Sequence, residues 1–421
     1  MPNVYESGTI FSGAHPAGQR TYYEQVLLET LRTKSILAPF TVMHEDFRGR
    51  DTGVINYSEV YDTEPNWNAL TESTIWMKGA HLDSRSVNIQ LEIHGDVIKI
   101  SDYSELVNYW NNGDLTGLCK GKLGQNVVDT IDILARNAFL STPYKAFAAG
   151  RANRAALTAA DLFNPDVAEL IRTHLEEREV PGVAAVSDAD VKGIVCVTTP
   201  RVIHDIRTAA GSAWIEANQY AGNIRKFTGE AGTWAGVRFL RTMRLVLKNC
   251  GAKIAQGTLA SATVPGQGAA STVDTVYSVG QSTSTRYITI NEAMPAEFVV
   301  GKTVTIHSQP LGDVVLESDG TQETRRIVAV DGAQKRLVFD KPLLKDHAAG
   351  DYVTLAIDVH GSIFMGGPGV VYGVGERAHP LALPKIDDMG MINRFSWRSF
   401  SKMQLFRPEM FEVVESAGTT N

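Results

Sequence analysis

Apolar positions recur every three or four residues from Gly117 to Thr142 and form the clearest helical pattern in the chain. The apolar residues at this spacing are Leu123, Val127, Ile131, Leu134 and Ala138, and the polar residues between them are Gln125, Asn126, Asp129, Asp132, Arg136 and Asn137. This period predicts an amphipathic helix with one buried side. Pro143 sets its C-terminal limit, so we expect a helix of roughly 20 residues, about 30 Å long.

The segment from Asp46 to Ile100 has weakly alternating β character and is interrupted at Glu64 by a polar loop that carries Trp67 and Trp76. It predicts two long antiparallel strands, the second running from Val87 to Ser104. An isolated two-stranded ribbon is at best marginally stable in water, so we expect it to lie against another protein surface.

The two tryptophans of that loop, Trp67 and Trp76, are candidate contacts to a neighbouring chain, because aromatic residues are favoured at interface cores. The alternative is that each tryptophan packs under its own loop. Residues 1–19 are rich in Gly, Ser and Pro and predict an extended arm. The helical face that follows, which includes Tyr22 and Leu27, is short and amphipathic, so we expect it to dock on another surface.

After the long helix, strand and helix patterns alternate and predict a compact α/β unit. Asn164 and Pro165 have the residue types of a helix N-cap and first turn, for a helix that ends before Pro181. A short apolar run, Lys192 to Pro200, is typical of a buried strand, and a second helical pattern covers residues 201–221.

The composition changes at about residue 253, where Thr, Val, Ser and Gly begin to dominate up to residue 358. Short alternating runs predict strands, and pairs such as Asp331-Gly332 predict the turns between them. The runs are RYITI, KTVTIH, RRIVAV, RLVFD and DYVTLAI. We therefore expect a small all-β domain inserted into the α/β unit, with closing strands after residue 359.

Length, charge and cysteine content narrow the class of protein. A chain of 421 residues exceeds the usual single-core limit. A net charge of -7 argues against a protein whose main role is to grip phosphate backbone. The three cysteines are odd in number and widely spaced, which suits a reducing cytoplasm. The sequence shows neither a signal-peptide pattern at its start nor a run of about 18 apolar residues, so we expect no membrane span.

Candidate chemistry is weak, so we expect no enzyme, no cofactor and no metal site. The glycines between Gly366 and Gly375 lack the lysine and hydroxyl ending of a phosphate-binding loop and favour a tight turn, as does the segment Gly229 to Gly232. The pairs Asp129/Asp132 and Asp387/Asp388 are best interpreted as solvated charges. The histidines are scattered without metal-ligand spacing.

Three segments, taken with the order of the predicted elements, resemble the major capsid proteins of tailed phages with the HK97-like fold, and the phage N4-like subgroup among them. These segments are Ile98 to Asp102 before the long helix, GEAGTWAGVRFLRT from Gly229 to Thr242, and DDMGMINRFSWRSFSKMQLF from Asp387 to Phe406. The resemblance implies an α+β fold. Its parts are an N-terminal arm (1–45), an extended loop (46–100), a peripheral domain with a spine helix (101–163), the first part of an axial domain (164–252), the inserted all-β domain (253–358) and closing strands of the axial and peripheral domains (359–421).

The resemblance further implies a structural protein that assembles into the hexamers and pentamers of an icosahedral shell around double-stranded DNA. Its partners would be copies of itself and scaffolding, portal and decoration proteins, with no sequence-specific DNA binding and no membrane. It would be made in the host cytoplasm and end in the virion. Two alternatives are an encapsulin-like nanocompartment shell and a carbohydrate-binding or hydrolase protein with a β module.

Overall fold

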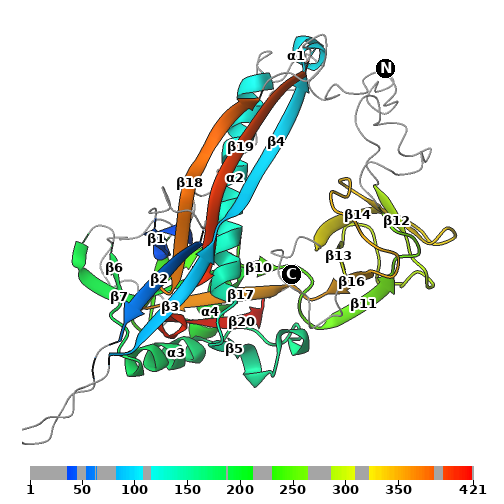
Figure 1. Cartoon of the computed structure of the whole chain (residues 1–421). Coiled ribbons are helices and arrows are strands. Elements are labelled where there is room, and N and C mark those ends of the chain that lie inside the picture. The colour runs from blue at the N-terminus through cyan, green and yellow to red at the C-terminus, as the bar shows by residue number, and fades with distance from the viewer. Residues whose placement is uncertain are drawn as a thin grey trace, which may run out of the picture.

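The computed structural model describes residues 36–44, 54–61, 63, 82–107, 115–185, 188–211, 230–263, 286–308, 322–383 and 392–419. The helix α2, Leu115–Leu140, has 26 residues and is about 39 Å long. It lies along a four-stranded sheet in the order β1 (Val42–His44), β18 (Val370–Leu383), β19 (Ile392–Leu405) and β4 (Glu92–Ser101) (Figure 1). The short helix α1, Asp102–Val107, follows β4 at the far end of this sheet. The long helix predicted from residue 117 is confirmed, and it begins two residues earlier.

Three polar residues of α2 are more buried than the sequence predicts. Asp132, Arg136 and Asn137 were expected on a solvated face, but their exposed fractions are 3%, 6% and 9%. The Asp132 carboxylate accepts hydrogen bonds from the backbone N–H groups of Ile36 and Leu37, at 3.3 and 3.4 Å. The solvated interpretation of Asp132 is therefore wrong, because the chain's own N-terminal segment covers this side of the helix. Asp129 forms an ion pair with Arg244, while Asp387 and Asp388 lie outside the described residues.

The segment expected as one strand from Val87 to Ser104 is divided at Leu91. The first part, β3 (Ser84–Gln90), pairs with β2 (Val54–Val60) in a separate two-stranded sheet. The second part, β4, pairs with β19 from Glu92 to Ser101 and so belongs to the sheet along α2. Only the first part of the predicted strand therefore forms the projecting ribbon.

The body of the subunit is an eight-stranded sheet covered on both faces. Its strands follow the order β5 (Lys145–Phe147), β20 (Phe411–Ala417), β17 (Val359–Met365), β7 (Asp188–Thr198), β9 (Val237–Arg241) and β8 (Glu230–Trp234), with β10 (Val246–Leu247) beside β17 and β6 (Val183–Ala185) beside β7. Cys196 and Phe364 face the helices α3 (Pro165–Glu177) and α4 (Pro200–Ala210). Val197 and Ile363 face the C-terminal half of α2. This alternation gives three layers.

The sequence predicted a helix cap and a turn in this body. The cap is confirmed and the position of the turn is wrong. The Asn164 side chain caps α3 by accepting from the Asp166 backbone N–H at 3.2 Å, with Pro165 in the first turn. The turn expected at Gly229 to Gly232 is wrong, because residues 230–234 form strand β8. The turn lies instead at Ala235 and Gly236, whose φ angles of 46° and 74° suit a two-residue hairpin.

The glycines after β17 form a closely packed connection to β18. A Cβ atom at Gly369 would lie 2.2 Å from the Phe411 ring, and one at Gly366 would lie 2.5 Å from Val180. The space around them is filled by side chains, which agrees with a tight turn and leaves no room for a phosphate. Within the described ranges the body also contains the 3-10 turns η2 (Ala38–Phe40), η4 (Ala148–Gly150), η5 (Arg154–Ala156) and η7 (Pro408–Met410).

Residues 253–358 contain a six-stranded sheet with its own core, at the right of Figure 1. The order is β11 (Lys253–Thr258), β16 (Tyr352–Ala356), β13 (Thr303–His307), β14 (Glu323–Asp331), β15 (Arg336–Phe339) and β12 (Tyr287–Thr289). A bridge between Leu259 and Ile290 joins the two ends of this order, so the sheet closes into a barrel. All five predicted strand runs are present.

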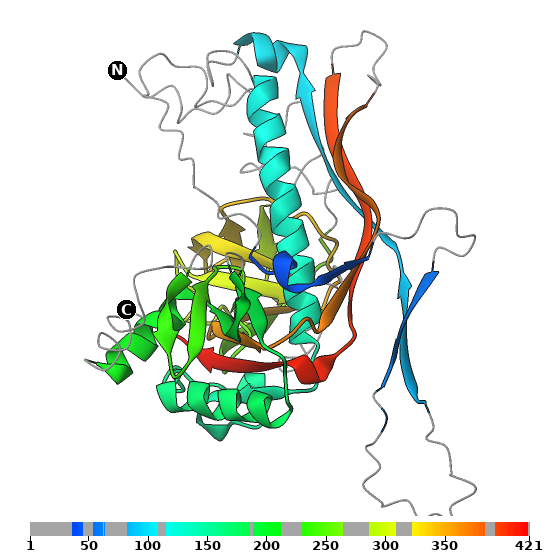
Figure 2. The same cartoon turned by 90° about the vertical axis from the view of Figure 1, so that its left-hand side faces the viewer.

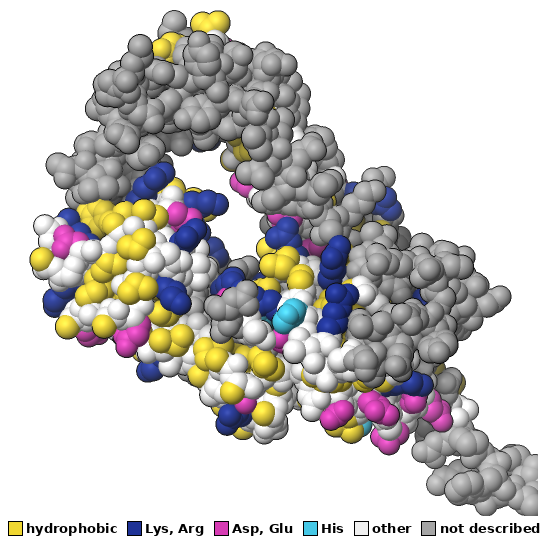
Figure 3. Space-filling view, turned by 180° about the vertical axis from the view of Figure 1, so that it is seen from behind, with side chains coloured by type: hydrophobic (Ala, Val, Ile, Leu, Met, Phe, Trp, Pro, Cys, Tyr) yellow, Lys and Arg dark blue, Asp and Glu magenta, His cyan; other side chains and the backbone are white. Residues whose placement is uncertain are grey.

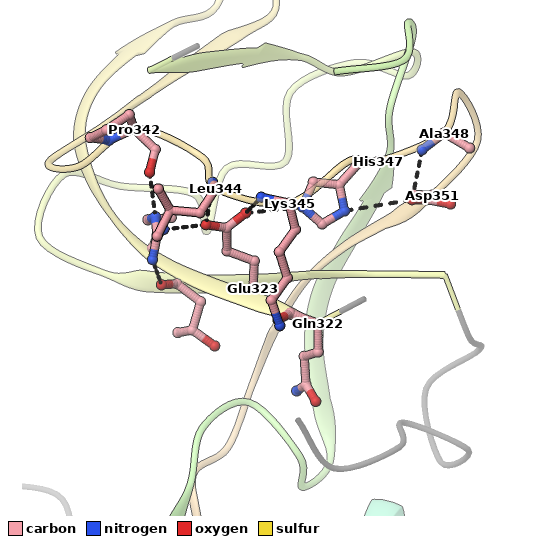
Figure 4. A network of polar contacts seen from close by, with 10 residues as sticks. Gln322, Glu323, Pro342, Leu344, Lys345, His347, Ala348 and Asp351 are labelled. Atoms are coloured by element: carbon pink, nitrogen blue, oxygen red, sulfur yellow. Dashed lines mark hydrogen bonds and ion pairs between the residues drawn. The ribbon is translucent and has the colours of Figure 1, made fainter. Parts of the chain in front are cut away.

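A polar network ties the segment after β15 to the barrel (Figure 4). The buried carboxylate of Glu323 contacts the fully buried His347 ring at 3.2 Å and accepts from the Leu344 backbone N–H at 2.8 Å. Burial acts to raise the pKa of Glu323, but these hydrogen bonds and the charge of Arg325 outweigh burial, so the pKa lies below its ordinary value. The carboxylate therefore stays charged and holds this segment in place.

Candidate assembly surfaces

Strands β2 and β3 form a ribbon that extends away from the body of the subunit (Figure 2). In the described part of the chain no third strand pairs with the ribbon. Its outward side chains are short and uncharged, and those described are Asn56, Ser58, Val60, Ser84, Ser86, Asn88 and Gln90. Short side chains allow another chain to approach the ribbon closely.

The inward face of the ribbon is attached to the body by four charged residues, which we call the charge quartet: Glu59, Arg85, Arg407 and Glu409. The Arg85 guanidinium donates to the two carboxylate oxygens of Glu409 at 2.8 and 3.1 Å. The Arg407 Nε donates to Glu59 at 2.6 Å. Each strand of the ribbon therefore contributes one charge to a pair with the turn η7.

Arg85 makes further contacts at the same place. It donates to the Phe406 carbonyl oxygen at 2.9 Å and to the Tyr61 hydroxyl oxygen at 2.5 Å. Burial acts to lower the pKa of Arg85, but the hydrogen bonds to Tyr61 and Glu409 outweigh burial and raise that pKa above its ordinary value. The residue therefore remains a fixed positive charge under all ordinary conditions.

Nearer the body, the ribbon is held by apolar packing. Ile89 is fully buried against Val371 and Phe406. The Tyr57 ring meets the Phe406 ring edge to face, with 4.6 Å between centroids, a favourable aromatic geometry. The ribbon thus has an apolar base and a charged contact further out.

The four residues expected from the sequence as contact candidates, Tyr22, Leu27, Trp67 and Trp76, lie outside the described residues. The charge quartet was not found by sequence reasoning. A hairpin register would place Glu59 opposite Arg85, but their partners lie 348 and 324 positions further along the chain. No local pattern identifies contacts at that separation.

Exposed apolar side chains gather at two other places. Tyr103 and Leu106, exposed by 67% and 84%, lie on α1 at the end of the four-stranded sheet. On the barrel, seen at the left of Figure 3, apolar side chains interrupt the polar surface, and those exposed by at least 47% are Ile254, Val299, Val300, Val328 and Leu344. These surfaces add to the area available for contacts between subunits.

We next searched the described residues for metal ligands, membrane-spanning helices and reactive thiols. Among them, no group of three or more His, Cys, Asp and Glu side chains could hold a metal ion. Within the same ranges, no helix is long and apolar enough to cross a membrane. Burial raises the pKa of the Cys250 thiol to about 11, and it raises the pKa of the Cys196 thiol well above its ordinary value, so both thiols are protonated near neutral pH.

Comparison with known proteins identifies the family of this chain. A family model described as phage capsid protein matches residues 121–336, just over half of the chain. The chain belongs to this family. It is a phage capsid protein. No curated protein sequence matches it.

Solved structures show that this capsid protein has the HK97-like fold. The capsid of Ralstonia phage GP4 matches with a TM-score of 0.54 at 10% identity, over 95% of this chain and 96% of that chain. The capsid of cyanophage P-SCSP1u matches with a TM-score of 0.51 at 8% identity, over 95% of this chain and 93% of that chain. The capsid of cyanophage Pam1 matches with a TM-score of 0.51 at 10% identity, over 96% of this chain and 98% of that chain. The α+β fold and the capsid function expected from the sequence are confirmed.

Proposed function

We propose that the β2–β3 ribbon of each capsid subunit lies across a neighbouring subunit and joins the two in the shell. The observation that supports this most directly is the ribbon itself, with which no third strand pairs in the described part of the chain. A two-stranded ribbon is marginal on its own in water, so a further surface must stabilise its outer part. A copy of the same chain is the partner that a self-assembling shell supplies.

In this proposal the parts of the subunit have different roles in a shell of hexamers and pentamers. Residues 1–45 act as an arm, 46–100 as the extended loop and 101–163 as the peripheral domain. Residues 164–252 form an axial domain that meets its copies around the symmetry axes, and residues 359–421 supply closing strands to the axial and peripheral domains. Identical contacts repeated around rings produce a closed assembly.

The barrel of residues 253–358 would lie on the outer surface of the shell as a decoration or a clamp between subunits. Its exposed apolar side chains, including Val300 and Leu344, favour contact with another protein. The shell would enclose DNA without sequence-specific contacts, since a chain of net charge -7 gains little from phosphate. Scaffolding, portal and decoration proteins would be its other partners, and the protein would have no enzymatic activity.

We further propose where the protein is made and to which subgroup it belongs. Synthesis in the host cytoplasm is supported by the reduced, buried thiols of Cys196 and Cys250. Membership of the N4-like subgroup rests on the three sequence segments described above.

Deletion of residues 64–80, between the two strands of the ribbon, tests the role of the ribbon. We expect a soluble, folded subunit that no longer forms stable shells, because the part that reaches the neighbour is lost. Negative-stain electron microscopy and size-exclusion chromatography measure assembly, and the thermal unfolding midpoint serves as the folding control. Shells of normal number and stability from the deletion variant would refute the proposal.

A further inference from the structure

The charge quartet has an unusual arrangement of near neighbours. Glu59 and Arg85 are directly opposite each other in the register of β2 and β3. Arg407 and Glu409 are separated only by Pro408 in the turn η7. Each arginine therefore pairs with one glutamate across the contact, and it has the other glutamate as its neighbour in strand register or along the chain.

We infer that the charge quartet is a reversible latch, which holds the ribbon against the body and can open without leaving a lone charge on either side. When the contact opens, the ribbon keeps Glu59 beside Arg85, and the body keeps Arg407 beside Glu409. Each separated surface then carries one positive and one negative charge of the quartet, so these charges sum to zero on both sides. The inference concerns the isolated subunit, so it holds whether or not the ribbon reaches a neighbour.

The exposure of the quartet fits a contact that can open. Its side chains are exposed by 26% and 32% for Arg85 and Glu409, and by 30% and 26% for Arg407 and Glu59. Ion pairs that water can reach contribute little each and weaken with salt, because the screening length is about 8 Å at physiological ionic strength. The latch is therefore sensitive to ionic strength.

The ribbon can pivot at its base, at the break between β3 and β4, because the quartet lies further out along the ribbon. The break between β3 and β4 lies at Leu91, next to the register shift of β18 between Val374 and Glu376. A Cβ atom at Gly375 would lie 2.6 Å from the Leu91 side chain, so the ribbon base packs closely on this shift. Ile89 is buried beside it, whereas Arg85 lies further out. Rotation about Leu91 would open the quartet, together with the Tyr57–Phe406 contact beyond Ile89, and would leave Ile89 itself in place.

Spin labels can measure the opening in the unassembled subunit. One label replaces Ser86 on the outward face of the ribbon and the other replaces Glu169 on α3, both exposed positions, in a C119S background. Pulsed electron spin resonance then gives the distance distribution between ribbon and body. For the unmodified quartet we expect a second, more distant population that grows as NaCl is raised from 0.05 to 1 M.

Two variants separate a latch from a simple pair of salt bridges. R407E places two negative charges against Glu59, so we expect the open population to dominate even at low salt. E59R/R407E restores attraction across the contact but leaves the ribbon with two positive charges and the turn with two negative ones. Opening then separates charges that have no neutralising neighbour, so this double variant should open less than the unmodified protein at every salt concentration.

Three results would overturn the inference. In the first, R407E leaves the distance distribution unchanged, which means that the quartet does not hold the ribbon. In the second, the double variant opens as readily as R407E, so the contact does not depend on charge pairing. In the third, the double variant behaves as the unmodified protein does, so the neighbours within each side have no effect. A failure of the residue 64–80 deletion to affect assembly would count against the proposed function and leave these distances unaffected.

Discussion

Arg154 donates two hydrogen bonds of 2.6 Å to Glu415, whose side chain is completely buried in strand β20. The bidentate geometry pairs both carboxylate oxygens with the guanidinium, which itself is 17% exposed. This pair joins the turn η5 to the C-terminal strand. Because Glu415 is fully buried, breaking this pair would leave a charge away from water, in contrast to the accessible charge quartet.

Arg154→Ala should lower the free energy of unfolding by about 3–5 kcal/mol, because it leaves a buried carboxylate without its partner. Urea unfolding followed by circular dichroism measures the change. Lys402→Ala is the matched control, since Lys402 pairs with Glu92 on the surface and its loss should cost about 1 kcal/mol or less. Equal effects of the two substitutions would contradict the interpretation of the Arg154–Glu415 pair.

Asp132→Ala should detach the N-terminal segment from α2. The substitution leaves the buried backbone N–H groups of Ile36 and Leu37 without an acceptor, at a cost of about 1–3 kcal/mol. Hydrogen exchange followed by mass spectrometry should show faster exchange across residues 36–44. Asp132→Asn, which retains one acceptor oxygen, should be the milder change, and full protection of the segment in the alanine variant would refute the prediction.

His360 should make the subunit less stable in mild acid. Burial lowers the pKa of its ring to about 4 from 6.5, and the ring contacts the Thr199 hydroxyl at 2.9 Å. The unfolded chain therefore binds a proton between these two pH values while the folded chain does not. Stability from this group is present above about pH 6.5 and falls as the pH drops towards 4, by up to roughly 3 kcal/mol.

Urea unfolding of the unmodified protein and of His360→Asn at pH 7.5 and pH 4.5 measures this dependence. The variant should lose less stability between the two pH values, even if it is less stable at both. An identical loss in the two proteins would show that His360 does not contribute to it.

Elements with a local signal could be predicted from the sequence. The period of α2, the cap at Asn164 followed by Pro165, and the Asp331-Gly332 turn depend on residues within a few positions of each other. The phage capsid resemblance added the fold, which the family model and solved structures support. The glycine segment at Gly229 was misinterpreted because a glycine in a strand resembles a turn until the pairing of β8 with β9 is known.

The sequence by itself determined the long helix α2, the capped helix α3 and where the β-rich insertion begins, because hydrophobic period, capping residues and turn residues act over short distances. Tertiary structure alone decided that Asp132 is buried, that β4 leaves the ribbon for β19, and that Glu59 and Arg85 meet the turn at Pro408. The partners of Glu59 and Arg85 lie more than 300 positions further along the chain. The partners of Asp132 lie nearly 100 positions before it. Such contacts are fixed by the packing of whole layers, and no short stretch of residues encodes them.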